Sequence, residues 1–327
     1  MIVAGRSFSD RLNQRLKPLI EITLKESFIM KKVGFIGLGI MGRPMSLNLL
    51  KAGVDLTVCD IDPAAVAQVV AAGATAATYE QIGVSCDIII TMLPNGSIVY
   101  DVLFGENGVA KTLTAGKIVC DMSSVTADQS KTCYAKLKEM GVGFVDAPVS
   151  GGEPGAVNAT LAIMCGGEQA DFDALLPYFE IMGSSALLIG PSGSGSVTKL
   201  ANQIIVNLNI AAVSEALVLA TKCGADPMLV YKAIRGGLAG SSVLDAKAPM
   251  MCARNFVPGG KISINHKDIK NVLDTAHTVD VPLPLTAQLF EIQQALKALG
   301  HMDDDHAGYV QYFEMLAGVE VKSDIKA

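Results

Sequence analysis

The chain has 327 residues, half of them hydrophobic, and a formal net charge of −6 at pH 7. This length allows two domains with a large core, and the mild negative charge argues against a nucleic-acid binder, which would usually present a basic face. The seven cysteines are scattered and include no Cys-x-x-Cys pair, which argues against a disulfide framework or a zinc site and indicates a reducing, cytoplasmic compartment.

The first 29 residues differ in character from the rest of the chain. They mix basic residues with Asp10, Glu21 and Glu26 and contain no long apolar run, which argues against a secretory signal. An organelle transit peptide is the alternative, which the acidic residues weaken. We expect residues 1–29 to be an upstream extension with no part in the chemistry, and the first domain to begin at Met30.

An apolar run at 33–36 leads directly into a complete Gly-x-Gly-x-x-Gly, which a helical pattern follows. In a dinucleotide-binding turn, Gly37 permits the tight turn, Gly39 lets a pyrophosphate approach and Gly42 lets the helix pack closely on the strand. The free N–H groups at the helix N-terminus then face the phosphates. The sequence therefore predicts a dinucleotide site rather than a chance glycine-rich turn. Its residues are Gly37, Leu38, Gly39, Ile40, Met41 and Gly42.

A second apolar run, at 55–59, ends at Asp60, 18 residues after the last glycine of the motif. A carboxylate here can accept a hydrogen bond from the ribose 2′-OH of NAD and would repel the 2′-phosphate of NADP. Asp62 adds a second negative charge, and no Arg stands beside it. We expect a preference for NADH, with NADPH possible. In the alternative interpretation, Asp60 only caps the helix that begins at Pro63.

Apolar runs alternate with helical patterns up to about residue 190, which predicts βαβ units and a largely parallel, doubly wound Rossmann-type sheet. The predicted strands are 32–37, 55–59, 87–92, 117–121, 143–146, 161–165 and 186–189. The predicted helices between them are 41–52, 63–72, 97–104, 126–140 and 170–182. Further helices are predicted at 195–222, 226–236, 241–250, 266–278, 284–298 and 305–317. We therefore expect a Rossmann domain at 30–193 and an all-α substrate and oligomerisation domain at 194–327.

The predicted helix 195–222 has no charged residue between Lys199 and Glu215, so a membrane span has to be considered. The amide side chains along it oppose that interpretation and favour the central helix of a globular domain. An apolar helix in an all-α domain can also bury its surface against another subunit. We expect a homodimer or homotetramer that does not enter a membrane.

Lys199 is the first candidate for chemistry, because it stands alone near the start of an apolar helix, just after a glycine-rich loop. A buried Lys has a lowered pKa, which suits proton transfer near neutral pH. Asn202 lies three residues further on, on the same helix face. The alternative is a Lys that extends from a helix end into solvent.

The second candidate is the segment 146–152, which directly follows a predicted strand. Ligands in open α/β sheets lie beyond the carboxyl ends of the strands. Ser150, Gly151 and Gly152 offer one hydroxyl group and closely approaching N–H groups, which suit a substrate carboxylate. An ordinary glycine-rich turn is the equal alternative.

Four blocks, in this order, resemble the β-hydroxyacid dehydrogenase family, and the resemblance covers residues 31–320. The blocks are 34–42, 146–152, 193–203 and 266–268. Finer detail is similar to the branch of this family that reduces tartronate semialdehyde (2-hydroxy-3-oxopropionate). That detail lies in 91–95, 150–154, 233–241 and 243–250.

The resemblance implies a reversible, NAD(P)H-dependent reduction of tartronate semialdehyde to D-glycerate, with Lys199 as the catalytic acid or base and no metal. Ser150, Gly151 and Gly152 would hold the substrate carboxylate, and Asn202 would position the substrate. The cofactor residues that it adds are Met92, Leu93, Pro94, Ser124 and Lys267. Another β-hydroxyacid substrate, such as 3-hydroxyisobutyrate, is the alternative. A non-catalytic dinucleotide-binding module is less favoured, because Lys199 is present.

Two positions depart from the family pattern. Gln203 stands where many members have Asn, which puts the substrate-orienting role of that position in question. The segment 158–160 stands where a Gly-Thr pair is usual, which puts the local loop geometry in question.

The segment 301–306 contains two His and three Asp residues and could suggest a metal site. We interpret it instead as a solvated loop in which Asp305 caps the last helix.

Overall fold

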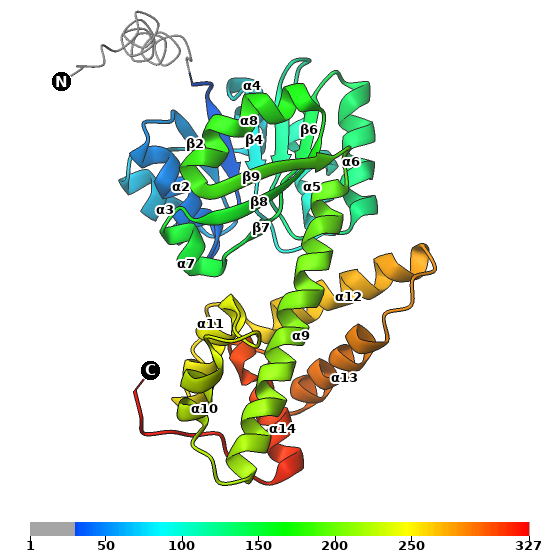
Figure 1. Cartoon of the computed structure of the whole chain (residues 1–327). Coiled ribbons are helices and arrows are strands. Elements are labelled where there is room, and N and C mark those ends of the chain that lie inside the picture. The colour runs from blue at the N-terminus through cyan, green and yellow to red at the C-terminus, as the bar shows by residue number, and fades with distance from the viewer. Residues whose placement is uncertain (1–29, 327) are drawn as a thin grey trace, which may run out of the picture.

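The computed structural model describes residues 30–326 and shows a sheet flanked by helices, followed by a helical part (Figure 1). The predicted extension at 1–29 lies outside the described residues. The sheet runs in the order β3-β2-β1-β4-β5-β6-β8-β7, and β9 pairs with β8. Its strands are β1 (Val33–Ile36), β2 (Leu56–Cys59), β3 (Thr75–Ala76), β4 (Ile88–Thr91), β5 (Ile118–Asp121), β6 (Gly143–Asp146), β7 (Val149–Ser150), β8 (Leu161–Gly167) and β9 (Gly183–Gly190).

Strands β1 to β6 pair in parallel, whereas β8 is antiparallel to both β6 and β7. The predicted Rossmann-type, largely parallel sheet is therefore confirmed. Its helices are α2 (Gly42–Lys51), α3 (Pro63–Ala71), α4 (Tyr79–Ser85), α5 (Gly96–Phe104), α6 (Ala127–Glu139), α7 (Gly152–Val157) and α8 (Gln169–Met182), with a 3-10 turn at Val109–Lys111. Each predicted strand and helix of this part is present.

Four short elements were not predicted, namely β3, β7, α4 and α7. Two-residue strands and helices of six or seven residues hold too few positions to show a hydrophobic period. Helix α4 does carry one local signal. Thr78 and Gln81 form a capping box at its start, a pattern that marks a helix N-terminus.

Beyond the sheet, the described chain is helical. Its elements are α9 (Ser194–Lys222), α10 (Pro227–Ile234), α11 (Ser242–Cys252), α12 (Ile262–Thr278), α13 (Pro284–Ala298), a 3-10 turn (His306–Tyr309) and α14 (Val310–Ala317). All six helices predicted here are present, although α12 begins four residues earlier than expected and the last helix begins as a 3-10 turn. The proposed domain boundary falls at the N-cap of α9, and the division into two domains stays a prediction.

Helix α9 links the two parts, because it begins against the sheet and then runs through the helical part (Figure 1). By length and hydropathy it could cross a bilayer, the one helix between residues 30 and 326 that could. It packs, however, against β8 and against α11, α12 and α14. Its buried face includes the polar Gln203, Asn207 and Ser214, and their hydrogen bonds are made within the protein.

Candidate active site

The glycine-rich turn follows β1 at the carboxyl edge of the sheet. Gly37 has φ +100°, and a Cβ there would collide with the carbonyl oxygen of Met92. A Cβ on Gly42 would collide with the carbonyl oxygen of Gly37, so this glycine lets α2 pack on the turn. A Cβ on Gly39, in contrast, would meet nothing within 4 Å. The open side of the turn is therefore at Gly39, where the motif predicts the pyrophosphate.

The N-terminus of α2 is suited to an anion. Met41, at its N-cap, provides no side-chain cap, and the N–H groups of Ile40 and Met41 have no backbone partner within the described part of the chain. Unpaired N–H groups at a helix N-terminus, together with the helix dipole, attract phosphate. The residues of this turn thus fit a dinucleotide.

Asp60 lies directly beside the glycine-rich turn. Its carboxylate accepts hydrogen bonds from the N–H groups of Leu38 and Asp62. The alternative in which Asp60 caps α3 is wrong, because Asp62 is the N-cap and accepts from the N–H of Ala64 at 2.9 Å. Asp60 also lines a cavity of about 590 Å³ between β2, α3 and the start of α4.

Two side chains that the sequence analysis missed order the next loops. Asp121 ends β5 and accepts hydrogen bonds from the Thr91 hydroxyl at 2.8 Å and from the Ser123 N–H at 3.1 Å. The Ser123 hydroxyl in turn accepts from the N–H of Leu93 at 2.8 Å. Burial raises the pKa of Asp121, and these donors oppose that rise. The sequence signal that could have identified Asp121 is the polar residue that ends each of the strands β4, β5 and β6, namely Thr91, Asp121 and Asp146.

Lys267, on α12, reaches the same loops from the helical part. Its ammonium donates to the carbonyl oxygens of Pro94 at 3.0 Å and Ser124 at 2.9 Å, and pairs with Asp268 at 3.0 Å. The structure therefore brings together Lys267, Pro94 and Ser124, three of the predicted cofactor residues. Met92 and Leu93 lie in the same loop, and the carbonyl of Met92 also faces Gly37.

Lys199 lies on the second turn of α9, whose start is held by a buried carboxylate. Asp146, at the end of β6, accepts from the N–H groups of Gly193 at 2.7 Å and Ser196 at 2.8 Å. A Cβ on Gly195 would collide with backbone oxygens of β6 and β8, so this glycine brings the helix directly onto the sheet. The arrangement fixes the position from which Lys199 extends.

The Lys199 ammonium forms no hydrogen bond or ion pair with any residue between 30 and 326. Burial lowers its pKa, nearby Asp268 opposes that change, and the charge of Lys267 lowers the pKa further. A lowered pKa makes the ammonium a better acid. An ammonium whose pKa is lowered by burial, and whose donors are unused by residues 30–326, suits proton transfer better than a surface Lys does.

The predicted substrate residues are connected to the cofactor loops by a chain of hydrogen bonds. The Ser150 hydroxyl donates to Asn202 at 3.3 Å, and Asn202 donates to Gln203 at 3.0 Å. Gln203 donates to Asp268 at 2.6 Å, and Asp268 pairs with Lys267. Gln203, the departure from the family pattern, thus joins Asn202 to the residue that pairs with Lys267.

The glycines of the carboxylate loop lie where β7 meets α7. Gly151 has φ +139° and Gly152 has φ +61°, conformations that favour glycine. The carbonyl oxygen of Gly259, from the helical part, lies 3.9 Å from the position of a Cβ on Gly152. The second departure also has a physical consequence, because Ala159 adopts φ +55°, where Gly would be free of strain.

The segment 301–306 differs from the prediction. Asp305 does accept from the N–H of Ala307 at the start of the last helical segment, but the loop is not solvated at this residue. Asp305 is fully buried and pairs with Lys247 at 2.8 Å. Asp305 can be buried because the largely enclosed Lys247 provides the counter-charge, and sequence spacing gives no sign of this pair.

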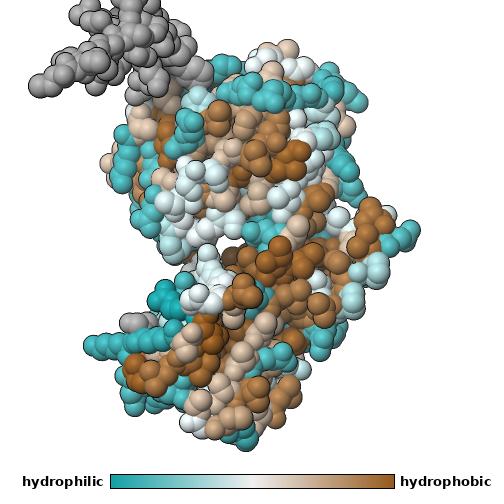
Figure 2. All heavy atoms as spheres, viewed as in Figure 1, coloured by the Kyte–Doolittle hydropathy of each residue, from teal (hydrophilic) through white to brown (hydrophobic). Residues whose placement is uncertain are grey.

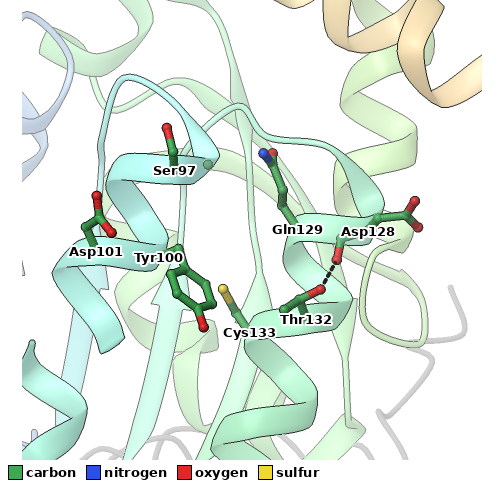
Figure 3. Close-up of a pocket in the computed structure, with 8 residues that line it drawn as sticks. Ser97, Tyr100, Asp101, Asp128, Gln129, Thr132 and Cys133 are labelled. Carbon is green, nitrogen blue, oxygen red and sulfur yellow. Dashed lines mark hydrogen bonds between the residues drawn. The ribbon is translucent and has the colours of Figure 1, made fainter. Parts of the chain in front are cut away.

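A separate cavity of about 350 Å³ lies between α5 and α6 (Figure 3). Tyr100 of α5 and Cys133 of α6 both line it, and Asp101 and Asp128 lie at its edges. None of the predicted site residues lines this cavity.

Comparison with known proteins agrees with this geometry. Residues 32–190 match a family model described as the NAD-binding domain of 6-phosphogluconate dehydrogenase. Residues 193–313 match one described as NAD-binding of NADP-dependent 3-hydroxyisobutyrate dehydrogenase. The chain is 44% identical to 2-hydroxy-3-oxopropionate reductase of Escherichia coli (strain K12) over 286 residues, which are 88% of this chain and 98% of that protein. The chain belongs to the β-hydroxyacid dehydrogenase family.

Other members of the family are similar over the same length. The chain is 37% identical to 2-(hydroxymethyl)glutarate dehydrogenase of Eubacterium barkeri, over 89% of this chain and 97% of that one. The structure of 3-hydroxyisobutyrate dehydrogenase of Mycobacterium tuberculosis with L-serine has a TM-score of 0.81 at 28% identity, and the match covers 87% of this chain and 99% of that one. The family predicted from the sequence is confirmed. This member is an NAD(P)-dependent oxidoreductase that acts on the CH–OH group of β-hydroxyacids.

Proposed function

We propose that this enzyme reversibly reduces tartronate semialdehyde to D-glycerate. The name of the 44% identical relative supports this substrate. The observation that carries the chemistry is Lys199, whose unpaired ammonium has a lowered pKa and lies one helical turn from Asn202, which contacts Ser150. The proposed proton donor Lys199, the loop 150–152 and the loops that Lys267 contacts therefore belong to one site.

The residues divide the reaction among them. The turn 37–42 would hold the cofactor phosphates, and Lys267 fixes the loops at Pro94 and Ser124 that would line the cofactor site. When bound, the reduced nicotinamide supplies the hydride. The N–H groups of 150–152 would bind the substrate carboxylate, together with the Ser150 hydroxyl when its proton turns from Asn202 to the substrate, and this would orient the aldehyde carbon toward the cofactor.

Lys199 completes the reduction as a general acid. The Lys199 ammonium would donate the proton that turns the aldehyde oxygen, as it gains negative charge, into a hydroxyl group. Lys199 is left as a neutral amine and regains a proton from water. In the oxidative direction the neutral amine accepts the hydroxyl proton, so one residue serves both directions.

We propose that NADH is preferred and NADPH is also used. The carboxylate of Asp60 lies at the glycine-rich turn, held by the N–H of Leu38, where it would accept from a ribose 2′-OH and repel a 2′-phosphate. Asp62 is the N-cap of α3 and adds negative charge.

We also propose that the chain forms a homodimer or homotetramer in the reducing cytoplasm, where its seven free thiols would be stable. Figure 2 shows hydrophobic surface over α9. Val197, Ile205 and Leu219 on this helix are 49%, 67% and 67% exposed. Their spacing places them along one face, which a second copy would cover.

A substrate panel tests the proposed reaction. Purified enzyme with NADH should oxidise the cofactor fastest with tartronate semialdehyde, measured by the loss of nicotinamide absorbance. Methylmalonate semialdehyde, the oxidation product of 3-hydroxyisobutyrate, should have a lower kcat/KM. A higher kcat/KM with methylmalonate semialdehyde would assign the enzyme to 3-hydroxyisobutyrate instead, and no turnover of either would contradict the reaction.

A further inference from the structure

Three side chains of the helical part form a cluster outside the machinery described so far. Asp305 is fully buried, and one of its oxygens accepts from the Lys247 ammonium at 2.8 Å. The same oxygen lies 3.5 Å from the imidazole of His306. Lys247 and His306 are each 14% exposed at their side chains, so both still reach open space.

The cluster faces the candidate active site. The other oxygen of Asp305 accepts from the N–H groups of Gly259 and Gly260 at 3.0 and 3.1 Å. Gly259 is the residue whose carbonyl approaches Gly152 of the carboxylate loop. In addition, Lys199 is close enough to lower the pKa of His306. The cluster is therefore linked through Gly259 to the loop 150–152 and lies within electrostatic range of Lys199.

The hydrogen bonds of His306 determine what it offers to a ligand. Its Nδ1 lies 2.7 Å from the carbonyl oxygen of Gly260, and because a carbonyl only accepts, Nδ1 must carry the proton. Burial lowers the pKa of His306 to about 4, and the charges of Lys247 and Lys199 add to this shift. The ring is therefore neutral at pH 7, and Nε2 is an acceptor with no partner in the part of the chain described.

Lys247 supplies the complementary group. Its ammonium has three donors, of which one is used by Asp305 and another lies only against the sulfur of Met250, at 3.8 Å. Together, Lys247 offers a donor and His306 an acceptor. A hydroxyl group, which accepts and donates at once, is complementary to this pair, whereas a methyl group or a hydrogen atom is not.

We propose that Lys247 and His306 bind the hydroxyl group on C2 of the substrate and make the enzyme selective for 2-hydroxy-3-oxo acids. This inference rests on the proposed reduction at C3 and names the group that distinguishes its substrate. With hydrogen or methyl at C2, the remaining donor of Lys247 and the Nε2 acceptor of His306 would find no hydrogen-bond partner on the substrate. A site built to hydrogen-bond a substrate hydroxyl rejects analogues that lack it far more strongly than an apolar pocket distinguishes sizes.

The test compares tartronate semialdehyde with malonate semialdehyde, which lacks the hydroxyl group, by kcat/KM with NADH. Lys247→Met removes the ammonium and keeps a long side chain. His306→Asn keeps a donor where Nδ1 contacts Gly260 and removes Nε2. The matched control is Lys261→Met, which removes an ammonium from the neighbouring surface pair with Asp303.

Each of the two variants should lower the preference for tartronate semialdehyde by about tenfold or more, mainly through a loss with that substrate, whereas Lys261→Met should leave the preference unchanged. Equal losses with both substrates would show a merely structural role and overturn the inference. If the wild-type enzyme reduces neither compound, the proposed reaction fails instead. NADH affinity, measured by fluorescence, should stay near the wild-type value and shows that each variant is folded.

Discussion

At the scale of single residues, Lys199 differs from an ordinary surface lysine because burial lowers its pKa. Replacing Lys199 with Ala should lower kcat by about 10²-fold or more, the usual scale for loss of a general acid. NADH binding should be retained, because Lys199 serves the substrate. The control is Lys222→Ala, which removes an exposed lysine at the other end of α9 and should leave kcat unchanged. Near-normal turnover by Lys199→Ala would falsify the assignment.

The lowered pKa of Lys199 leads us to expect that the rates of reduction and oxidation depend on pH in opposite ways. In the proposed mechanism the reductive reaction needs the protonated Lys199, so kcat/KM should fall as the pH rises through its pKa. Because burial and Lys267 lower that pKa, the fall should occur below the ordinary value for lysine, 10.5. The oxidative reaction needs the neutral amine and should rise over the same range. The opposite trends, recorded in initial-rate profiles, should be absent from Lys199→Ala.

Ser150 tests the carboxylate loop. Ser150→Ala removes a hydroxyl group from the substrate carboxylate and should raise KM by about tenfold, the effect of one hydrogen bond to a charged group. The affinity for NADH should change less, because the loop lies on the substrate side. A loss of NADH affinity at unchanged KM would instead place Ser150 at the cofactor.

A site residue could be predicted from the sequence only where it belongs to a motif of a few consecutive residues. Lys199, Ser150 and the glycines belong to short motifs, so the sequence alone nominated them. Gln203 and Asp268 lie 65 positions apart, and Lys247 and Asp305 lie 58 apart. No spacing rule connects such pairs, because only the packing of α9 on α12, and of α11 on the turn His306–Tyr309, brings them together.

At the scale of elements, the start of α9 is held by one buried carboxylate. Asp146→Ala leaves the N–H groups of Gly193 and Ser196 without their acceptor and should destabilise the fold by about 2 kcal/mol. It should also lower kcat, because Lys199 extends from the next turn. The control is Asp128→Ala, which removes an acid from the first turn of α6 and should cost only a few tenths of a kcal/mol. Thermal unfolding that begins no earlier for Asp146→Ala than for the control would contradict this role.

The turn between β2 and α3 tests the cofactor preference. Wild-type enzyme should show a higher kcat/KM with NADH than with NADPH at moderate salt, since high salt would screen the repulsion. Asp60→Ala should move the ratio toward NADPH. Asp62→Asn keeps an N-cap on α3 and should move the ratio less. A wild-type preference for NADPH, or an Asp60→Ala ratio equal to that of wild type, would exclude Asp60 as the determinant.

For elements long enough to show a hydrophobic period, the predicted bounds lie close to the observed ones, whereas the shortest elements were not predicted at all. The four parallel strands 33–36, 56–59, 88–91 and 118–121 are fully or almost fully buried, so each appears in the sequence as a continuous apolar run. Strand β7 has only two residues and depends on its pairing with β8, so local sequence cannot reveal it.

At the scale of the whole molecule, α9 contributes to three tasks. Its first turns dock on the sheet through Asp146, its second turn presents Lys199, and its remaining length is the core of the helical part. The sheet residues and the helical residues meet through Lys267, which bridges Pro94 and Ser124. The active site therefore needs both parts in one arrangement, although the cofactor motif lies entirely in the first.

The exposed apolar face of α9 makes the last prediction, because soluble monomers rarely leave such a stripe uncovered. Ile205→Asp places a charge in the middle of that face and should shift the protein to a smaller species in sedimentation velocity. Leu187→Asp is the matched control, since Leu187 is also 67% exposed but belongs to strand β9 and not to the exposed face of α9, and it should sediment as wild type. Wild-type enzyme that sediments as a monomer, or Ile205→Asp that keeps the wild-type mass, would exclude this face as the subunit interface.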